Sequence, residues 1–339
     1  MSKNVLGERG YYKPFTHNKF YEYYLTHFAM MWTPEETKLD DDVYDWNNKL
    51  SKSEKHFLTN VFRFFTEADV DVAGAYSEVY LPLFKLPEVR MMLLDFAARE
   101  AVHIRAYSYL IDTVGMPSTT YKAFYDYEAM VNKHDYFKSF KSPDGSIDIP
   151  TLLRQIAAFS AFTEGMQLFS SFIMLLNFKR FGKMKGMGEL VQWSIRDEEC
   201  HFQGMAELFK TLVRENPEYN TDELRDDIYN IARTMVDLEN KFIDLCFEMG
   251  PMEGLTSDEV KEYIKYICDR RLIGLGYKGI FKVKTNPLFW VEEMLNAPGH
   301  SNFFEARSTD YSRGVHTGSW SKFWTKPSTG GADEHPENA

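Results

Sequence analysis

Two short patterns constrain this chain more than its composition does. Of its histidines, two follow a glutamate by three positions: Glu100 precedes His103, and Glu198 precedes His201. Side chains at i and i+3 share one face of a helix, so each pair can grip one metal ion from the same side. A single pair arises by accident in acidic helices. Two pairs, each within an apolar helical pattern, predict a shared metal site.

Each pair is preceded by one acidic residue embedded in an apolar run. Asp69 stands in VFRFFTEADVDVAG, and Glu164 stands in AFSAFTEGMQLF. An unpaired buried carboxylate costs roughly several kcal/mol or takes up a proton, so a cation partner is the economical explanation of Glu164. Glu67 and Asp71, the acidic neighbours of Asp69, are interpreted as surface groups or as groups that support the ligands.

The chain thus repeats the order acid, Glu-x-x-His, with each half formed by two helices and a loop. Four carboxylates and two imidazoles in a four-helix core are the ligand set of ferritin-like dinuclear iron or manganese carboxylate proteins. The alternative is a set of buried ion-paired acids with core histidines, but four helices would have to supply that arrangement by coincidence. The predicted metal ligands are Asp69, Glu100, His103, Glu164, Glu198 and His201.

Composition excludes several other classes of protein. The 339 residues are 44% hydrophobic and 16% aromatic, which fits a folded domain and not a disordered or fibrous chain. A formal net charge of -11 argues against nucleic acid or an anionic membrane as the main partner. Three cysteines without C-x-x-C spacing indicate neither a disulfide framework nor a zinc knuckle, and the N-terminal residues lack a signal-peptide pattern. A cytoplasmic location is therefore expected.

Helical periodicity runs through almost every long segment, and no segment is convincing as a strand. The expected class is all-α, a ferritin-like bundle of about eight long helices in a domain of residues 1–296, with a flexible tail at 297–339. The apolar stretch Ile156 to Phe178 has Glu164 and Gln167 at its centre, which favours a core helix over a membrane span. Helices are expected at about 51–75, 87–115, 121–140, 150–182, 188–215, 221–249 and 256–275.

Together these motifs resemble the radical-generating small, or beta, subunit of class I ribonucleotide reductase. FFTEAD at 64–69, REAVHIRAY at 99–107, FTEG at 162–165 and IRDEECH at 195–201 stand in that family's order and spacing. The resemblance extends from MMWTPEE at 30–36 to NFFEARSTDYSR at 302–313. It implies two bound iron ions, with manganese or a mixed pair as alternatives. It also implies a homodimer that serves a large (alpha) subunit in reducing ribonucleotides to deoxyribonucleotides.

The resemblance assigns a radical path to four aromatic or acidic residues. Tyr107 lies seven positions after Glu100, close to the same helix face, and would carry a stable tyrosyl radical made when the reduced metal pair meets dioxygen. Trp32 and Asp197 would relay the radical, with Asp197 hydrogen-bonded to a ligand histidine. Tyr311, in the tail, would pass it between subunits. There are alternatives to these radical roles. The aromatic residues would simply pack in the core or the tail, and Asp197 would form an ion pair with its neighbour Arg196.

This sequence departs from the family in two places. In the family, bulky apolar side chains surround the radical tyrosine. The corresponding positions of this chain are Leu168, Phe172 and Ser194, so the pocket around Tyr107 is expected to be more polar at Ser194. After Tyr311 the ending is not the usual acidic and apolar one. Docking on the large subunit is therefore hypothesised to use the tail aromatics Trp320, Phe323 and Trp324.

Three other functions remain to be weighed. A ferritin-like di-metal oxidase or hydroxylase acting on its own small substrate would use the same ligands, but it would need an open cavity at the metals and no Tyr107. A metal-storage protein would be shorter and richer in entry acids. A purely structural helical scaffold is disfavoured by the buried Glu164. Within RDEECH, Glu199 is interpreted as a solvated or ion-paired neighbour and Cys200 as a small packed side chain.

Overall fold

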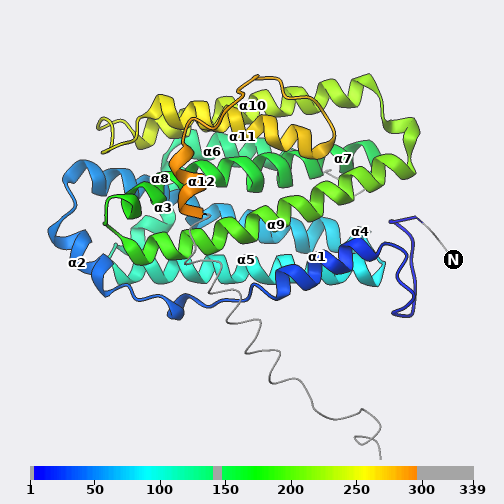
Figure 1. Ribbon diagram of the computed structural model, residues 1–339, viewed down its shortest axis with the longest axis horizontal. Helices are drawn as coiled ribbons and strands as arrows, with labels where there is room; N and C mark the ends of the chain where they lie inside the picture. Colours follow the sequence, from blue (N-terminus) through cyan, green and yellow to red (C-terminus); the bar gives the residue numbers. More distant parts are fainter. Residues whose placement is uncertain (1–3, 140–146, 296–339) are drawn as a thin grey trace, which may run out of the picture. The chain divides into compact units, whose positions relative to one another are not determined.

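The computed structural model describes residues 4–139 and 147–295 of the chain. Within these ranges every named element is a helix, as Figure 1 shows. The predicted all-α class is therefore confirmed.

Four long helical segments form the core. They are α3 (Lys52–Ala75), α5 (Pro87–Thr113), a continuous apolar segment over Ile149–Arg180, and α9 (Lys185–Glu215). α3 packs along α5, and α9 contacts both α5 and the apolar segment. At Gly204 of α9 an added Cβ would lie 2.9 Å from Met92 Sδ, so glycine permits the close approach of α9 to α5.

The other helices pack around this core. α1 (Asn18–Phe28) lies along α5, while α10 (Asp222–Cys246) and α11 (Ser257–Leu275) pack together and against the apolar segment (Figure 1). The remaining α-helices are α2 (Asp40–Asn48), α4 (Leu81–Leu83), α6 (Glu128–Lys138) and α12 (Phe289–Leu295). Short 3-10 helices lie at η1 (Pro34–Glu36), η3 (Ser118–Asp126) and η5 (Pro217–Tyr219).

The apolar segment is a core helix, as expected. By length and composition it could cross a membrane, but the 18-residue window that passes this test is 100% buried inside the protein. It consists of α7 (Ile149–Ile156), a π-helical stretch η4 (Ala157–Gln167) and α8 (Leu168–Arg180). A second π-helical stretch, η2 (Tyr76–Tyr80), follows α3. π-Helical turns are rare and often lie at functional sites, and the site described below involves both stretches.

Several helix ends lie where the sequence predicts them, and others do not. The predicted capping box at Ser51 is present, with Ser51 Oγ accepting from the Glu54 N–H at 3.2 Å and Glu54 Oε2 accepting from the Ser51 N–H at 2.8 Å. The single helix expected over 121–140 is instead the 3-10 stretch η3 followed by α6, because the backbone is extended at Tyr127. The expected helices did not include α1 and α2.

The start of α9 shows why one of these ends was misplaced. The helix begins at Lys185, ahead of the expected Gly188, because the Asp42 carboxylate of α2 accepts the backbone N–H groups of Gly186 and Met187 at 2.9 and 3.0 Å. This cap comes from a distant part of the chain. Burial raises the pKa of Asp42 to about 6.

Candidate dinuclear metal centre

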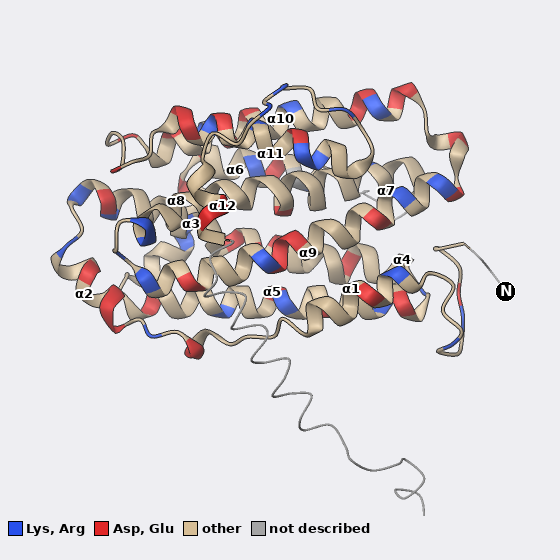
Figure 2. Ribbon diagram, in the orientation of Figure 1, with Lys and Arg blue, Asp and Glu red and all other residues tan. Residues whose placement is uncertain are grey.

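Water does not reach the six predicted ligands. Asp and Glu are interspersed with Lys and Arg along the helices (Figure 2), but the acids of this cluster belong to the interior. Asp69 and His103 are 1% exposed, and the other four are 0% exposed. They come from all four core segments, namely α3 (Asp69), α5 (Glu100, His103), η4 (Glu164) and α9 (Glu198, His201).

Two glutamates lie between the two histidines. His103 Nδ1 is 3.4 Å from Glu100 Oε2 and 3.1 Å from Glu198 Oε1. His201 Nδ1 is 3.0 Å from Glu100 Oε1 and 3.4 Å from Glu198 Oε2. Each of these carboxylates therefore turns one oxygen toward each imidazole, an arrangement that lets it bridge two ions.

The other two carboxylates occupy opposite ends of the cluster. Glu164 Oε1 is 3.5 Å from His201 Nδ1, whereas the strongest charge interaction of Asp69 is with His103. Ligand atoms of Glu100, Glu164, Glu198 and His201 all lie within 4.8 Å of one another. The arrangement divides into an Asp69 and His103 end and a Glu164 and His201 end, with two shared glutamates.

The donors fit a pair of cations. Asp69 Oδ2 and both carboxylate oxygens of Glu100 and of Glu198 are buried and accept no hydrogen bond from the described residues. Burial raises the pKa of Asp69 well above its ordinary range and raises the pKa of Glu164 to about 8. Two divalent ions would neutralise the four carboxylates and satisfy these oxygens, which is the chemistry that a buried acidic cluster requires.

The far side of His103 leads to Trp32. Asp197 Oδ2 lies 3.3 Å from His103 Nε2 and accepts hydrogen bonds from Trp32 Nε1 at 2.6 Å and from Arg99 at 3.0 Å. Burial opposes the charge of Asp197, but His103 and Arg99 more than compensate and hold its pKa well below the usual range. Asp197 also lies 3.5 Å from the Arg196 guanidinium, so the ion pair considered as an alternative is present beside these hydrogen bonds.

The far side of His201 has its own support, which the sequence did not reveal. His201 Nε2 is 3.1 Å from His27 Nε2, and His27 Nδ1 is 2.6 Å from Asp95 Oδ2. Burial lowers the pKa of His27 to about 4, so its ring is neutral. A neutral His27 that donates from Nδ1 to Asp95 accepts at Nε2 from His201, which leaves His201 Nδ1 directed toward the carboxylates.

Tyr107 lies in a sealed pocket one turn beyond His103. It is 3% exposed and stacks on Phe65, with ring centroids 4.2 Å apart and planes at 13°. Its hydroxyl donates to Ser194 Oγ at 3.1 Å, so Ser194 makes the pocket more polar, as expected. Burial raises the pKa of Tyr107 well above its ordinary range, so the phenol stays protonated. The other two positions of the expected wall, Leu168 and Phe172, are buried.

The structure also identifies a buried tyrosine that the sequence did not. Tyr76 is 0% exposed, and its hydroxyl donates to Glu164. One sequence feature could have identified Tyr76. It lies seven residues after Asp69, which is the same spacing as that of Tyr107 from Glu100.

The remaining residues of the motifs have structural roles. Glu199 pairs with Arg271 at 2.8 Å, and Cys200 is buried. The glycine of FTEG allows Arg271 to approach, because a Cβ on Gly165 would lie 2.9 Å from Arg271 Nε. Four residues with predicted roles lie outside the described residues: Tyr311, Trp320, Phe323 and Trp324.

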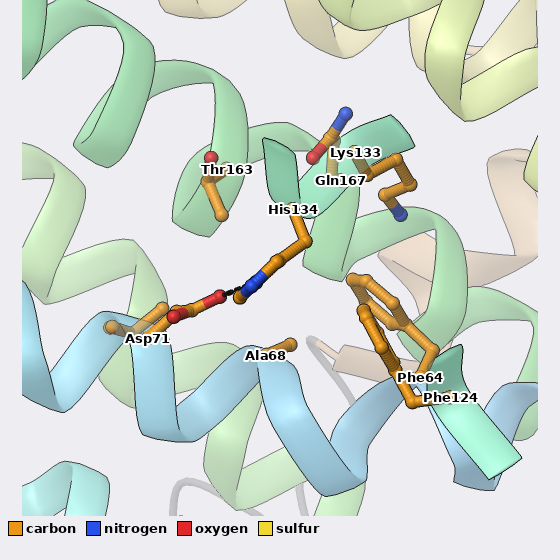
Figure 3. A pocket seen from close by; sticks show the side chains of 9 residues that line it. Phe64, Ala68, Asp71, Phe124, Lys133, His134, Thr163 and Gln167 are labelled. Carbon is orange, nitrogen blue, oxygen red and sulfur yellow. Dashed lines mark hydrogen bonds and ion pairs between the residues drawn. The ribbon is translucent and has the colours of Figure 1, made fainter. Parts of the chain in front are cut away.

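A second group of possible ligands lies elsewhere on α3. Glu67 and Asp71 share with His134 a set of ligand atoms within 4.8 Å of one another. Asp71 pairs with His134 beside a cavity of about 30 Å³ (Figure 3), and Glu67 accepts a hydrogen bond from Tyr125 at 2.8 Å. These contacts agree with the interpretation of Glu67 and Asp71 as surface or supporting groups.

Four carboxylates and two imidazoles in a four-helix core define the ferritin-like class of dinuclear carboxylate proteins. A family model described as "Ribonucleotide reductase, small chain" matches residues 9–287. The probable ribonucleoside-diphosphate reductase small subunit 376L of Invertebrate iridescent virus 6 is 49% identical over 96% of this chain and 99% of its own length. The ribonucleoside-diphosphate reductase subunit beta of Chlamydia pneumoniae is 30% identical over 88% of each chain.

The chain belongs to the ribonucleotide reductase small-chain family, whose members bind a dinuclear metal centre. It is the small subunit of this oxidoreductase and therefore works with a large subunit. Solved structures agree on the fold. A putative class I ribonucleotide reductase from Bacillus halodurans is similar with a TM-score of 0.76 at 21% identity, covering 81% of this chain and 99% of that one. The dimanganese(II)-NrdF of Streptococcus sanguinis has a TM-score of 0.71 at 19% identity, covering 82% and 97%.

Proposed function

We propose that this small subunit holds two iron or manganese ions in the six-residue cluster and stores a radical on Tyr107. Asp69 and His103 would bind one ion, Glu164 and His201 the other, and the two remaining glutamates would bridge them. The observation that carries the proposal is the burial of four carboxylates around two imidazoles, one helical turn from a sealed tyrosine. When bound and exposed to dioxygen, the metal pair supplies a one-electron oxidant.

The protein's contribution at Tyr107 is to position the phenol and to exclude water. Stacking on Phe65 fixes the ring, and the hydrogen bond to Ser194 fixes the hydroxyl. A neutral tyrosyl radical persists only where solvent and reductants have no access, and the 3% exposure of Tyr107 meets that condition.

The contribution at Asp197 is to connect the cluster with Trp32. The Asp197 carboxylate holds His103 in one orientation and accepts the indole N–H of Trp32 through the same oxygen. The Arg99 guanidinium keeps this carboxylate ionised. We propose that an oxidising equivalent leaves along this contact and reaches the large subunit through Tyr311.

Further parts of this proposal concern the assembly. Residues 1–296 would form the ferritin-like domain, and the tail at 297–339 would dock on the large subunit and carry Tyr311. The small subunit would act as a cytoplasmic homodimer, with neither nucleic acid nor a membrane as partner. The net charge of -11 supports this choice of partners.

Electron paramagnetic resonance tests the proposal. Apoprotein loaded with Fe(II) or Mn(II) and exposed to air is expected to give a stable tyrosyl signal that Tyr107→Phe abolishes. Tyr109→Phe, on the same helix, is the matched control and should keep the signal. Metal binding without any radical, together with no stimulation of ribonucleotide reduction by a large subunit, would contradict the proposal and favour an oxidase with its own substrate.

A further inference from the structure

A second buried tyrosine contacts the cluster more directly than Tyr107 does. The Tyr76 hydroxyl donates to Glu164, lying 2.9 Å from Oε1 and 3.1 Å from Oε2. Its ring centroid is 5.8 Å from that of His201, at an interplanar angle of 73°. Tyr76 therefore touches both residues at one end of the proposed centre.

Tyr76 and Tyr107 differ in the group that accepts the hydrogen bond from their hydroxyl. Tyr76 stands seven positions after Asp69, as Tyr107 does after Glu100, so the two helices of the first half of the repeated pattern each place a tyrosine at this spacing from a predicted ligand. The Tyr107 hydroxyl donates to the alcohol of Ser194, whereas Tyr76 donates to a carboxylate. A carboxylate is a far stronger proton acceptor than an alcohol, so a proton can leave Tyr76 more readily when an electron is withdrawn.

The backbone around this contact is unusual on both sides. Tyr76 opens the π-helical stretch η2, and Glu164 lies within the π-helical stretch η4. Because π-helical turns are rare and gather at functional sites, their coincidence at one hydrogen bond points to a role for that bond.

The surroundings of Tyr76 exclude water. Phe96, Phe159 and Tyr80 pack edge-on against its ring, with centroids 6.0, 6.2 and 5.9 Å away. Tyr76 itself is 0% exposed. An aromatic cage of this kind protects an oxidised tyrosine from solvent and from soluble reductants.

We propose that Tyr76 is a second redox-active tyrosine of this subunit. The inference rests on the proposed function, because the oxidant is the metal pair after its reaction with dioxygen. With the metal pair bound and oxidised, Tyr76 would lose one electron to it and its phenolic proton along the hydrogen bond to Glu164, which would leave a neutral tyrosyl radical at position 76. Tyr107 competes for the same oxidising equivalent, so the Tyr76 radical accumulates when Tyr107 cannot be oxidised.

The test uses the full chain in a Tyr107→Phe background. Protein loaded with Fe(II) is mixed with air-saturated buffer, frozen at successive times and measured by electron paramagnetic resonance. We expect a short-lived tyrosyl signal that disappears when Tyr76→Phe is added and persists when Tyr80→Phe is added. Tyr80 is the matched control, since it is 1% exposed and packs beside Tyr76 and Phe159.

A second variant covers the case in which Tyr76→Phe fails to fold or to bind metal. Difluorotyrosine placed at position 76 keeps the hydroxyl and its hydrogen bond, and fluorine splittings should appear in the signal of the Tyr107→Phe chain. Absence of a tyrosyl signal in that background, or a signal without fluorine splittings, would overturn the role of Tyr76. The stable Tyr107 signal of the unaltered chain would then still support the proposed function, so the two ideas fail separately.

Discussion

Replacing Asp197 by asparagine removes one negative charge from the interior and keeps the side-chain shape. In the unaltered chain this carboxylate faces Arg99, whose side chain is 1% exposed, and also accepts from Trp32. The substitution leaves the Arg99 charge buried without its anion, and removing one member of a buried ion pair costs about 3–5 kcal/mol. Arg99 keeps its hydrogen bond to the Met30 carbonyl at 2.9 Å, so we expect the lower end, about 3 kcal/mol.

Urea unfolding of the metal-free chain measures this loss, because metal binding would add its own stabilisation. Glu199→Gln is the matched control two positions along α9. Glu199 is 39% exposed and pairs with Arg271 nearer the surface, where a pair contributes about 1 kcal/mol or less. A loss for Asp197→Asn no larger than that of Glu199→Gln would refute the reasoning.

The pH dependence gives the same prediction a second check. The folded-state pKa of Asp197 lies below that of the unfolded chain, so its contribution is present above the unfolded value of about 3.9 and is lost as the pH falls toward the folded value. The difference in unfolding free energy between the unaltered chain and Asp197→Asn should therefore be constant near neutrality and shrink below about pH 4.

Three further predictions concern Ser194, Gly165 and Asp42. Ser194→Ala removes the hydrogen bond to Tyr107, so high-field electron paramagnetic resonance should show a shifted g-tensor for the radical, and an unchanged tensor would contradict the contact. Gly165→Ala forces a Cβ into Arg271 and should lower the unfolding free energy by about 1–3 kcal/mol, whereas Gly74→Ala in α3, with nothing within 4 Å, should not lower it. Asp42 has a folded pKa raised to about 6, so its ionisation lowers stability as the pH rises through that value. Asp42→Asn should remove this component from denaturation curves taken between about pH 4 and 7.

Residues that depend on local periodicity could be placed from the sequence. Glu100 and His103, and likewise Glu198 and His201, share a face because i and i+3 positions do so on any helix. Glu164 was expected to be buried from its apolar neighbours, and the structure agrees. The capping box at Ser51 is equally local, since both partners lie within one turn.

Residues that depend on distant contacts could not be placed in this way. His27 supports His201 from α1, a helix that the sequence analysis did not predict, and the two residues are 174 positions apart in the sequence. The start of α9 is set by Asp42, which belongs to another short helix. Tyr76 reaches Glu164 through two π-helical stretches, whose extra residue per turn shifts the side-chain direction from that of a regular helix.

Anomalous X-ray diffraction from crystals of the metal-loaded chain tests the central claim most directly. Data collected at the absorption edge of the bound metal should show two peaks. One should be bound by Asp69 and His103, the other by Glu164 and His201, with Glu100 and Glu198 bridging them. A single peak, or metal held only by Glu67, Asp71 and His134, would contradict a dinuclear centre at this site.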